Sequence, residues 1–251
     1  MITANKILEE INDYNLIKLN LDDHYNFEKS DNAYLIKSGS MLSFGENNFT
    51  QLMGEYDPVG FSEVILARKK SLRYKLLSDI ELLSFSGMKI RKEVNNCDVV
   101  MKSIIKYSLA RIFRNSKSKG NYLLEDEFIT KYHNFFRKFQ YTKGDQIFVC
   151  DQEPRGMYFI DKGSVSIFTK SDKFITTLGQ GETFGESALI SGKLRNNTAI
   201  AECDTLLIEV SSETLDKRIS KETPLVKLTL LSVLRRLELM NKLRMPSDFN
   251  S

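Results

Sequence analysis

Residues 178–199 read LGQGETFGESALISGKLRNNTA, and this stretch decides how the fold is interpreted. Its glycines at 179, 181 and 185 do not follow the G-x-G-x-x-G spacing of a dinucleotide-binding loop. Only about one or two helical turns fit before Gly192, whereas a dinucleotide fold needs a full crossover helix and a parallel strand after it. The stretch is therefore not a dinucleotide-binding loop.

The same stretch nevertheless has the chemistry of an anion site. Gly185 lets the backbone approach a ligand at a positive φ, and a short turn from Glu186 would point free N–H groups near Ser187 and Ala188 at an anion. Arg195 follows a short loop later and can offer a fork of donors to phosphate oxygens. Because Glu186 can accept a hydrogen bond from a sugar hydroxyl, the residues together predict a nucleotide pocket.

The stretch resembles the phosphate-binding cassette of the cyclic-nucleotide-binding domain family. That family includes catabolite activator proteins, regulatory subunits of cAMP-dependent protein kinase and cyclic-nucleotide-gated channels. Its pattern is close to F-G-E-x-A-L-I-x-G-x-x-R-x-x-T-A, which stands here as Phe184–Gly192, Arg195 and Thr198-Ala199. The likeness covers about residues 128–240, with upstream matches at Gly144, Ile147, Phe148, 157–160, Gly163 and Val165. It implies an eight-stranded jelly roll flanked by helices.

The resemblance also implies a role for each matching residue. Arg195 would pair with the exocyclic oxygens of a cyclic phosphate, Glu186 would bind the ribose 2′-hydroxyl, and N–H groups near Ala188 would cap the phosphate. The expected ligand contacts are Gly185, Glu186, Ser187, Ala188, Arg195, Asn196, Asn197 and Thr198, with Thr198 near the base. A purine pocket would be lined by Val165, Ile167, Leu178 and Phe184. A residue of the C-terminal helix, Leu237, Met240 or Leu243, would cover the base.

Simpler interpretations of the same residues stay open. Arg195 could be a solvated surface arginine, Glu186 a buried acid paired with a neighbour, and the four apolar residues ordinary barrel core. Asn196 stands where alanine accompanies cAMP preference in the family and threonine or serine often accompanies cGMP. The expected ligand is therefore cAMP or cGMP without a stated preference, and no cofactor or metal is expected.

The chain contains a second version of this pattern. Residues 34–44 (YLIKSGSMLSF) match residues 158–168 (YFIDKGSVSIF) at an offset of 124, and residues 61–63 (FSE) match residues 184–186 (FGE) at an offset of 123. Short alternating segments separated by glycine turns indicate antiparallel strands. We therefore predict a mainly β protein with flanking helices, made of two tandem jelly-roll domains at residues 1–117 and 118–251.

The first copy lacks parts of the cassette. At an offset of 123, the counterparts are Leu72 for Arg195, Ser62 for Gly185, Ile65 for Ala188 and Glu63 for Glu186. Serine restricts the backbone that glycine frees, and isoleucine crowds an approaching phosphate. The prediction is a degenerate pocket in the first copy, and the alternative is a relocated site that uses Arg73.

A helix is predicted after Asp98, which suits the N-cap position, and another after Pro224, which suits a first turn. The second helix carries an apolar seam at 4-3-4-3 spacing: Val226, Leu230, Val233, Leu237 and Met240. This seam can pack on its own domain, or on a second chain as a homodimer.

Composition excludes several classes of function. The 251 residues carry 36 basic and 33 acidic side chains, and a net charge of +3 is too mild for a nucleic-acid footprint. No apolar run approaches the ~20 residues of a membrane span, and the N-terminus lacks a signal-peptide block, so a cytoplasmic protein without membrane contact is expected. The isolated Cys97, Cys150 and Cys203, with only two histidines, provide poorly for a metal centre or a catalytic triad.

These observations predict a non-enzymatic cyclic-nucleotide sensor. Ligand at the C-terminal domain would shift the C-terminal helix and so regulate a protein partner of unknown identity. The alternatives are a ligand-independent scaffold or a kinase-type regulatory subunit. A truncated transcription factor of the catabolite-activator type is a weaker alternative, because only six residues follow Met245.

Overall fold

The computed structural model describes residues 4–45, 50–70, 72–113, 137–186 and 194–243. Residues 2–109 with 221–236 form one compact unit, and residues 110–220 with 237–251 form the other. The expected domain boundary at residues 117 and 118 lies outside the described residues. No helix in the described ranges is long and apolar enough to span a membrane.

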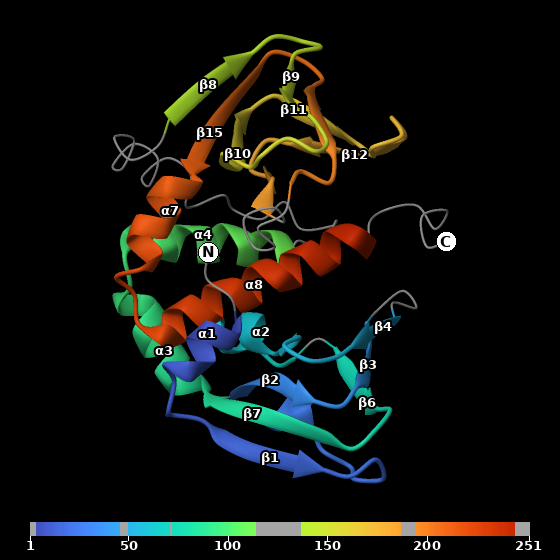
Figure 1. The fold of residues 1–251 in the computed structure, drawn as a ribbon, viewed down its shortest axis with the longest axis vertical. Helices are drawn as coiled ribbons and strands as arrows, with labels where there is room; N and C mark the ends of the chain where they lie inside the picture. Colours follow the sequence, from blue (N-terminus) through green and yellow to red (C-terminus); the bar gives the residue numbers. More distant parts are fainter. Residues whose placement is uncertain (1–3, 46–49, 71, 114–136, 187–193, 244–251) are drawn as a thin grey trace. The chain divides into compact units, whose positions relative to one another are not determined.

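The first copy consists of two antiparallel sheets with helices at both ends of its sequence (Figure 1). Strands β1 (Asn15–Leu19), β7 (Ile80–Ser86), β2 (Asn32–Ser38) and β5 (Pro58–Val59) form one sheet in that order, and β4 (Thr50–Met53), β3 (Met41–Phe44) and β6 (Arg73–Leu76) form the other. The helical segments are α1 (Ala4–Glu9), η1 (Phe27–Lys29), α2 (Phe61–Ile65), α3 (Gly87–Asn96) and α4 (Val99–Ile112).

The second copy repeats this arrangement. One sheet has the order β13 (Thr183–Phe184), β10 (Gly156–Lys162), β15 (Thr205–Ser211) and β8 (Arg137–Tyr141). The other has the order β12 (Phe174–Gly179), β11 (Ser164–Phe168), β14 (Thr198–Ala201) and β9 (Gln146–Phe148). Helices α7 (Ser212–Ile219) and α8 (Pro224–Leu243) follow. The mainly β fold with two jelly-roll copies and flanking helices is thus confirmed.

Each copy has its own apolar core, as its strand patterns predict. In β11, Val165 and Ile167 are buried in one core with Leu178 and Phe184. The first copy buries a separate set that includes Tyr34, Met41 and Leu82. Alternate residues of a strand point to opposite faces, so each sheet contributes one apolar face to its core.

Strand register corrects the sequence alignment of the two copies. Tyr34 pairs with Val59 in the first copy, and its equivalent Tyr158 pairs with Phe184 in the second. The counterpart of Phe184 is therefore Val59, 125 residues earlier, and not Phe61. The FSE match at an offset of 123 was wrong by two residues, because it rested on a short chance similarity.

The same offset of 125 holds on the far side of the cassette. Phe44 pairs with Arg73, and the equivalent Phe168 pairs with Thr198. Counting back from this register places Lys70, and not Leu72, at the position of Arg195. Arg73, the residue of the alternative relocated site, is exposed on β6.

The first part of α8 belongs to the same compact unit as the first copy. Oε1 of Glu222 accepts a hydrogen bond from the backbone N–H of Asp98 at 2.6 Å, and the Nε atom of Arg235 lies 3.3 Å from Oδ1 of Asp57. The seam residues Val226, Leu230, Val233 and Leu237 are buried within this single chain. A homodimer built on these four side chains would therefore require α8 to leave its place. The side chain of Met240 lies outside the described residues.

Candidate functional site

The backbone of Arg195 makes two hydrogen bonds that fix its position. Its N–H donates to the carbonyl of Gln152 at 2.9 Å, and its carbonyl accepts from the N–H of Asp151 at 2.8 Å. This two-bond bridge ties the end of the cassette to the loop between β9 and β10. The position of the side chain is therefore set by main-chain hydrogen bonds.

The guanidinium of Arg195 is almost fully buried, with 3% of the residue exposed. Nη1 donates to the carbonyl of Gly185 at 2.8 Å and Nη2 donates to the carbonyl of Gly156 at 2.6 Å. Its central carbon lies 4.1 Å from the ring centroid of Phe148 and 5.8 Å from that of Tyr158. The interpretation of Arg195 as a solvated surface arginine is therefore wrong.

Burial and charge act in opposite directions on Arg195. Burial lowers the pKa of its guanidinium, and Tyr158 and Glu186 oppose that shift. Arginine keeps its proton across the physiological range, so the site holds a permanent positive charge. A guanidinium has five N–H donors, and the two carbonyl bonds leave donors for an anion.

Gly185 is required for a reason that the sequence did not suggest. Its φ of +84° is rarely adopted by other residues, and a Cβ atom there would lie 2.7 Å from Nη1 of Arg195. The sequence suggests that this glycine makes room for a ligand. In the structure it makes room for the arginine side chain.

Glu186 follows directly and is buried, with 2% of the residue exposed. Its carboxylate raises the pKa of Arg195, so the acid and the arginine of the cassette influence each other electrostatically. A buried, charged neighbour of Arg195 also fits the simpler interpretation of Glu186 as a buried acid that is paired with a nearby residue. Ser187 and Ala188, the expected phosphate-capping residues, lie outside the described residues.

The residues after Arg195 differ in exposure. Asn196 is exposed and Asn197 is half-buried, so both side chains are placed at the margin of the site. Thr198 is buried, and its Oγ1 accepts a hydrogen bond from the backbone N–H of Cys150 at 3.1 Å. The threonine therefore joins the start of β14 to the loop after β9.

The four apolar residues expected around a purine are all buried in the core of the second copy: Val165, Ile167, Leu178 and Phe184. The ring of Phe184 lies 5.3 Å from that of Tyr158 and 5.8 Å from that of Phe148. These contacts are those of ordinary barrel core. Phe148 and Tyr158, which lie against Arg195, were part of the matching sequence but had no predicted role.

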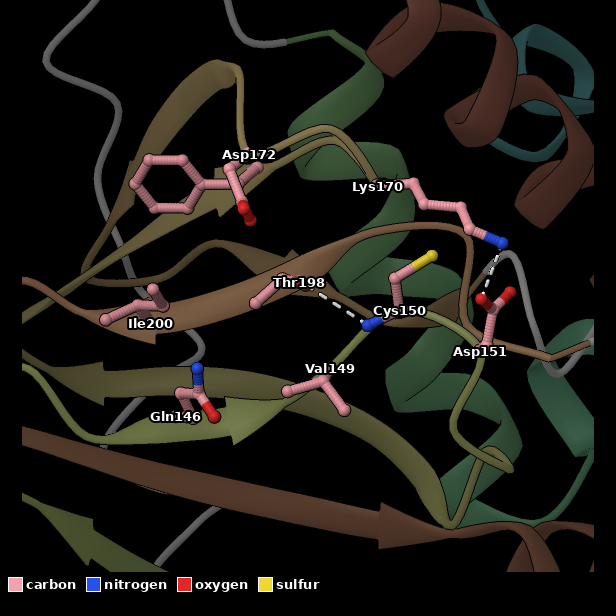
Figure 2. Close-up of a pocket in the computed structure, with 9 residues that line it drawn as sticks. Gln146, Val149, Cys150, Asp151, Lys170, Asp172, Thr198 and Ile200 are labelled. Carbon is pink, nitrogen blue, oxygen red and sulfur yellow. Dashed lines mark hydrogen bonds and ion pairs between the residues drawn. The ribbon is translucent and has the colours of Figure 1, made fainter.

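A cavity of about 560 Å³ lies elsewhere on the second copy (Figure 2). Of the expected ligand contacts it includes only Thr198, and its other lining residues are Gln146, Val149, Cys150, Asp151, Phe168, Lys170, Asp172 and Ile200. Nζ of Lys170 and Oδ2 of Asp151 form an ion pair at 2.7 Å beside it. Phe168 and Ile200 alternate with the core residues Ile167 and Ala199, so this cavity is on the opposite face of the sheet from the core.

Leu237, one of the three residues expected to cover the base, is buried. The side chains of the other two, Met240 and Leu243, lie outside the described residues. Among the residues that the structure does describe, no group of three or more His, Cys, Asp or Glu side chains could hold a metal ion.

Comparison with known proteins shows what the second copy is similar to. Residues 138–222 match the family model of the cyclic nucleotide-binding domain. The chain is similar to cAMP-bound PfPKA-R, at 16% identity over 96% of this chain and 85% of that chain, with a TM-score of 0.38. It is also similar to the regulatory domain of Toxoplasma gondii PKA with cAMP, at 15% identity, 95% and 87% coverage and a TM-score of 0.35.

Another similar structure is the catabolite activator protein of Thermus thermophilus, at 27% identity over 48% of this chain and 58% of that chain, with a TM-score of 0.40. The family match covers most of the strands that surround Arg195, from β8 to β15. The matched stretch contains the cassette glycine, acid and arginine, and residues 138–222 of this chain are therefore similar to the cyclic nucleotide-binding domain family.

Proposed function

We propose that this protein is a non-enzymatic sensor that binds cAMP or cGMP in its second domain. The observation that carries the proposal is Arg195, a buried cation with unused donors, fixed beside Glu186 in a domain similar to this family. A phosphate is the natural partner of such a guanidinium, because charge-assisted hydrogen bonds are strongest where water is excluded. A neutral ligand would add no charge-assisted hydrogen bond to this guanidinium.

The remaining cassette residues supply the other contacts in this proposal. Glu186 accepts a hydrogen bond from the ribose 2′-hydroxyl, and the N–H groups of Ser187 and Ala188 cap the phosphate. Gly185, Asn196, Asn197 and Thr198 complete the contact set. The aromatic rings of Phe148 and Tyr158 support the back of the guanidinium, so the ligand meets a preorganised cation.

Signalling requires that the ligand prefer one state of the protein over another. We propose that the ligand draws in the cassette and shifts α8, whose movement changes the binding of a protein partner. Residues 224–236 of α8 belong to the same compact unit as the first copy, so a displaced helix would disturb that unit.

Isothermal titration tests the binding step. The wild-type protein should bind cAMP or cGMP, and Arg195→Ala should weaken binding by about 100-fold, because it removes charge-assisted hydrogen bonds. Arg155→Ala is the matched control, since Arg155 is exposed in the same domain. Thermal melts should show that both variants are folded.

Absence of binding by the wild-type protein, or equal affinity of folded Arg195→Ala, would contradict the proposal. A kinase-type regulatory role is the second candidate, favoured by the tandem arrangement of two jelly-roll copies. Pull-down with and without nucleotide separates a sensor from a ligand-independent scaffold, because only the sensor should release or capture its partner when nucleotide is added.

A further inference from the structure

The first copy keeps a positive-φ glycine and a buried cation at the cassette positions that the structure describes. Gly60, the counterpart of Gly185, has a φ of +77°, and a Cβ atom on it would collide with the side chain of Lys70. Lys70 stands at the position of Arg195, is buried, and donates from Nζ to the carbonyl of Ser30 at 2.6 Å. The first copy therefore keeps the arrangement of a glycine that makes room for a buried cation.

The aromatic support of that cation is also kept. Nζ of Lys70 lies 5.5 Å from the ring centroid of Tyr34, which is the counterpart of Tyr158 beside Arg195. The two copies thus place a buried cation against the same tyrosine. They differ in which acidic residue lies near it.

Two substitutions move the acidic residue. At the corrected offset of 125, Phe61 replaces Glu186 and Glu63 replaces Ala188. The first copy therefore has no acid at the position proposed to bind a ribose. It has instead a carboxylate at a position proposed to face a phosphate.

Glu63 is buried on α2, with 2% of its side chain exposed, and its Oε1 lies 3.7 Å from Nη2 of Arg236 on α8. The Arg236 side chain is itself only 11% exposed. Burial lowers the pKa of Lys70, and the carboxylates of Glu63 and Asp31 oppose that shift. Glu63 therefore lies within ion-pair distance of Arg236 on α8, and its charge also raises the pKa of Lys70.

Further charges extend this group within the same unit. Nη1 and Nη2 of Arg91 on α3 donate to the two carboxylate oxygens of Asp31 at 2.8 and 2.7 Å. Nη1 of Arg91 also donates to the carbonyl of Val64 on α2 at 3.0 Å. Arg91 thereby links the helix that carries Glu63 to α3 and to Asp31.

We propose that the cassette of the first copy is an intramolecular docking site for α8, in which Glu63 is the built-in anion and Arg236 is the group it holds. This proposal concerns the first copy, to which the proposed function assigns no ligand. Only the comparison of Glu63 with a ligand phosphate rests on that function. A cyclic nucleotide would have to place its phosphate against the Glu63 carboxylate, so this cassette rejects nucleotide and retains the helix.

The docking contact is tested in the full chain without nucleotide. Glu63→Gln should raise the unfolding equilibrium constant by on the order of a hundredfold, because it removes the carboxylate that lies beside the buried Arg236 and one of the two that stabilise the charge of Lys70. Arg236→Gln should raise it only by on the order of tenfold, because Glu63 keeps Lys70. The double variant should cost less than the two single variants combined, as expected for groups in direct contact.

Arg235→Gln and Asp57→Asn are the matched controls, because this pair lies one position away on α8 and is more exposed. Each control should change the constant by less than about threefold. In hydrogen-exchange mass spectrometry, residues 224–236 should exchange faster in both Glu63→Gln and Arg236→Gln than in the controls.

Additive effects in the double variant, or unchanged exchange in α8, would overturn the proposal. If Glu63→Gln fails to fold, Arg236→Gln alone tests the contact, because residues 224–236 should still exchange faster in this variant than in the controls. Nucleotide titration of the second domain has no part in these measurements. A failure of the docking contact is therefore distinguishable from a failure of the proposed sensor.

Discussion

At the level of single residues, the second copy combines a buried arginine, a tyrosine and a second acid. The hydroxyl of Tyr158 donates to Oε1 of Glu209 at 3.2 Å, and the ring of Tyr158 lies near the guanidinium of Arg195. Burial, with smaller effects of charge, raises the pKa of Tyr158 to about 12. The tyrosine is thus held in its protonated form while it bonds the acid.

This shift predicts a pH dependence of stability. The pKa of an unfolded tyrosine is about 10, so the folded state binds the proton more tightly. The stabilisation is complete below about pH 10 and is lost as the pH rises from about 10 to about 12. Urea unfolding of the wild-type protein should therefore show a steeper alkaline decline than that of Tyr158→Phe. Parallel declines would contradict the assignment.

At the level of helices, the two copies start equivalent elements in different ways. Ser211 is the N-cap of α7, and its side chain accepts a hydrogen bond from the N–H of Thr214 at 3.2 Å. Its counterpart Ser86 is the N-cap of α3 but makes no such hydrogen bond. Identical residues at equivalent positions therefore contribute differently to stability, because only one satisfies a free N–H group.

The pair provides an internally controlled prediction. Ser211→Ala should lower the free energy of unfolding by about 1 kcal/mol, the usual cost of losing an N-cap. Ser86→Ala should change it by less than about 0.5 kcal/mol. Chemical denaturation followed by circular dichroism measures both. Equal losses in the two variants would show that the capping bond is not the source of the difference.

At the level of the whole chain, the compact units do not follow the sequence repeat. Residues 221–236 follow the second copy in sequence but pack with the first. The buried Leu225, Val226, Leu230 and Val233 therefore complete the apolar packing of that unit. The stability of the first copy therefore depends on the C-terminal helix, which lies more than a hundred residues later in the sequence.

A chain that ends after Ser220 should reveal this dependence. We expect residues 27–109 to lose protection in hydrogen exchange, because their unit loses a buried helix. Residues 137–211 should keep most of their protection, since their strands and core stay complete. Loss of protection in the second copy instead would contradict this division of the chain.

Much of the fold was accessible from local patterns. Alternation in segments such as Ser164–Phe168 and glycine turns such as Gly163 predicted short antiparallel strands, and the structure contains them. The cap at Asp98 was predicted as well, and its Oδ1 accepts from the N–H of Val100 at 2.8 Å. Such features depend on a few neighbouring residues, and therefore one sequence is enough to predict them.

The interior of the site was less accessible. The sequence suggested that Arg195 faces a ligand, whereas the structure also places its guanidinium on Phe148 and on two carbonyls. Main-chain carbonyls belong to every residue alike, so no residue type marks them as partners. The burial of Lys70 was likewise not predicted, because the residue stands in a basic run and a sequence does not distinguish a surface lysine from one that packs against a tyrosine ring.

The sequence alone determined the tandem repeat and the mainly β fold, because residue type and spacing within short segments carry them, and it predicts an anion site at Arg195 on the same basis. Only the tertiary structure decided that the copies align at 125 residues, that Lys70 replaces the arginine, and that Glu63 contacts Arg236. Strand hydrogen bonds set the first two, and packing between distant segments set the third. Both depend on contacts that chain order does not encode locally.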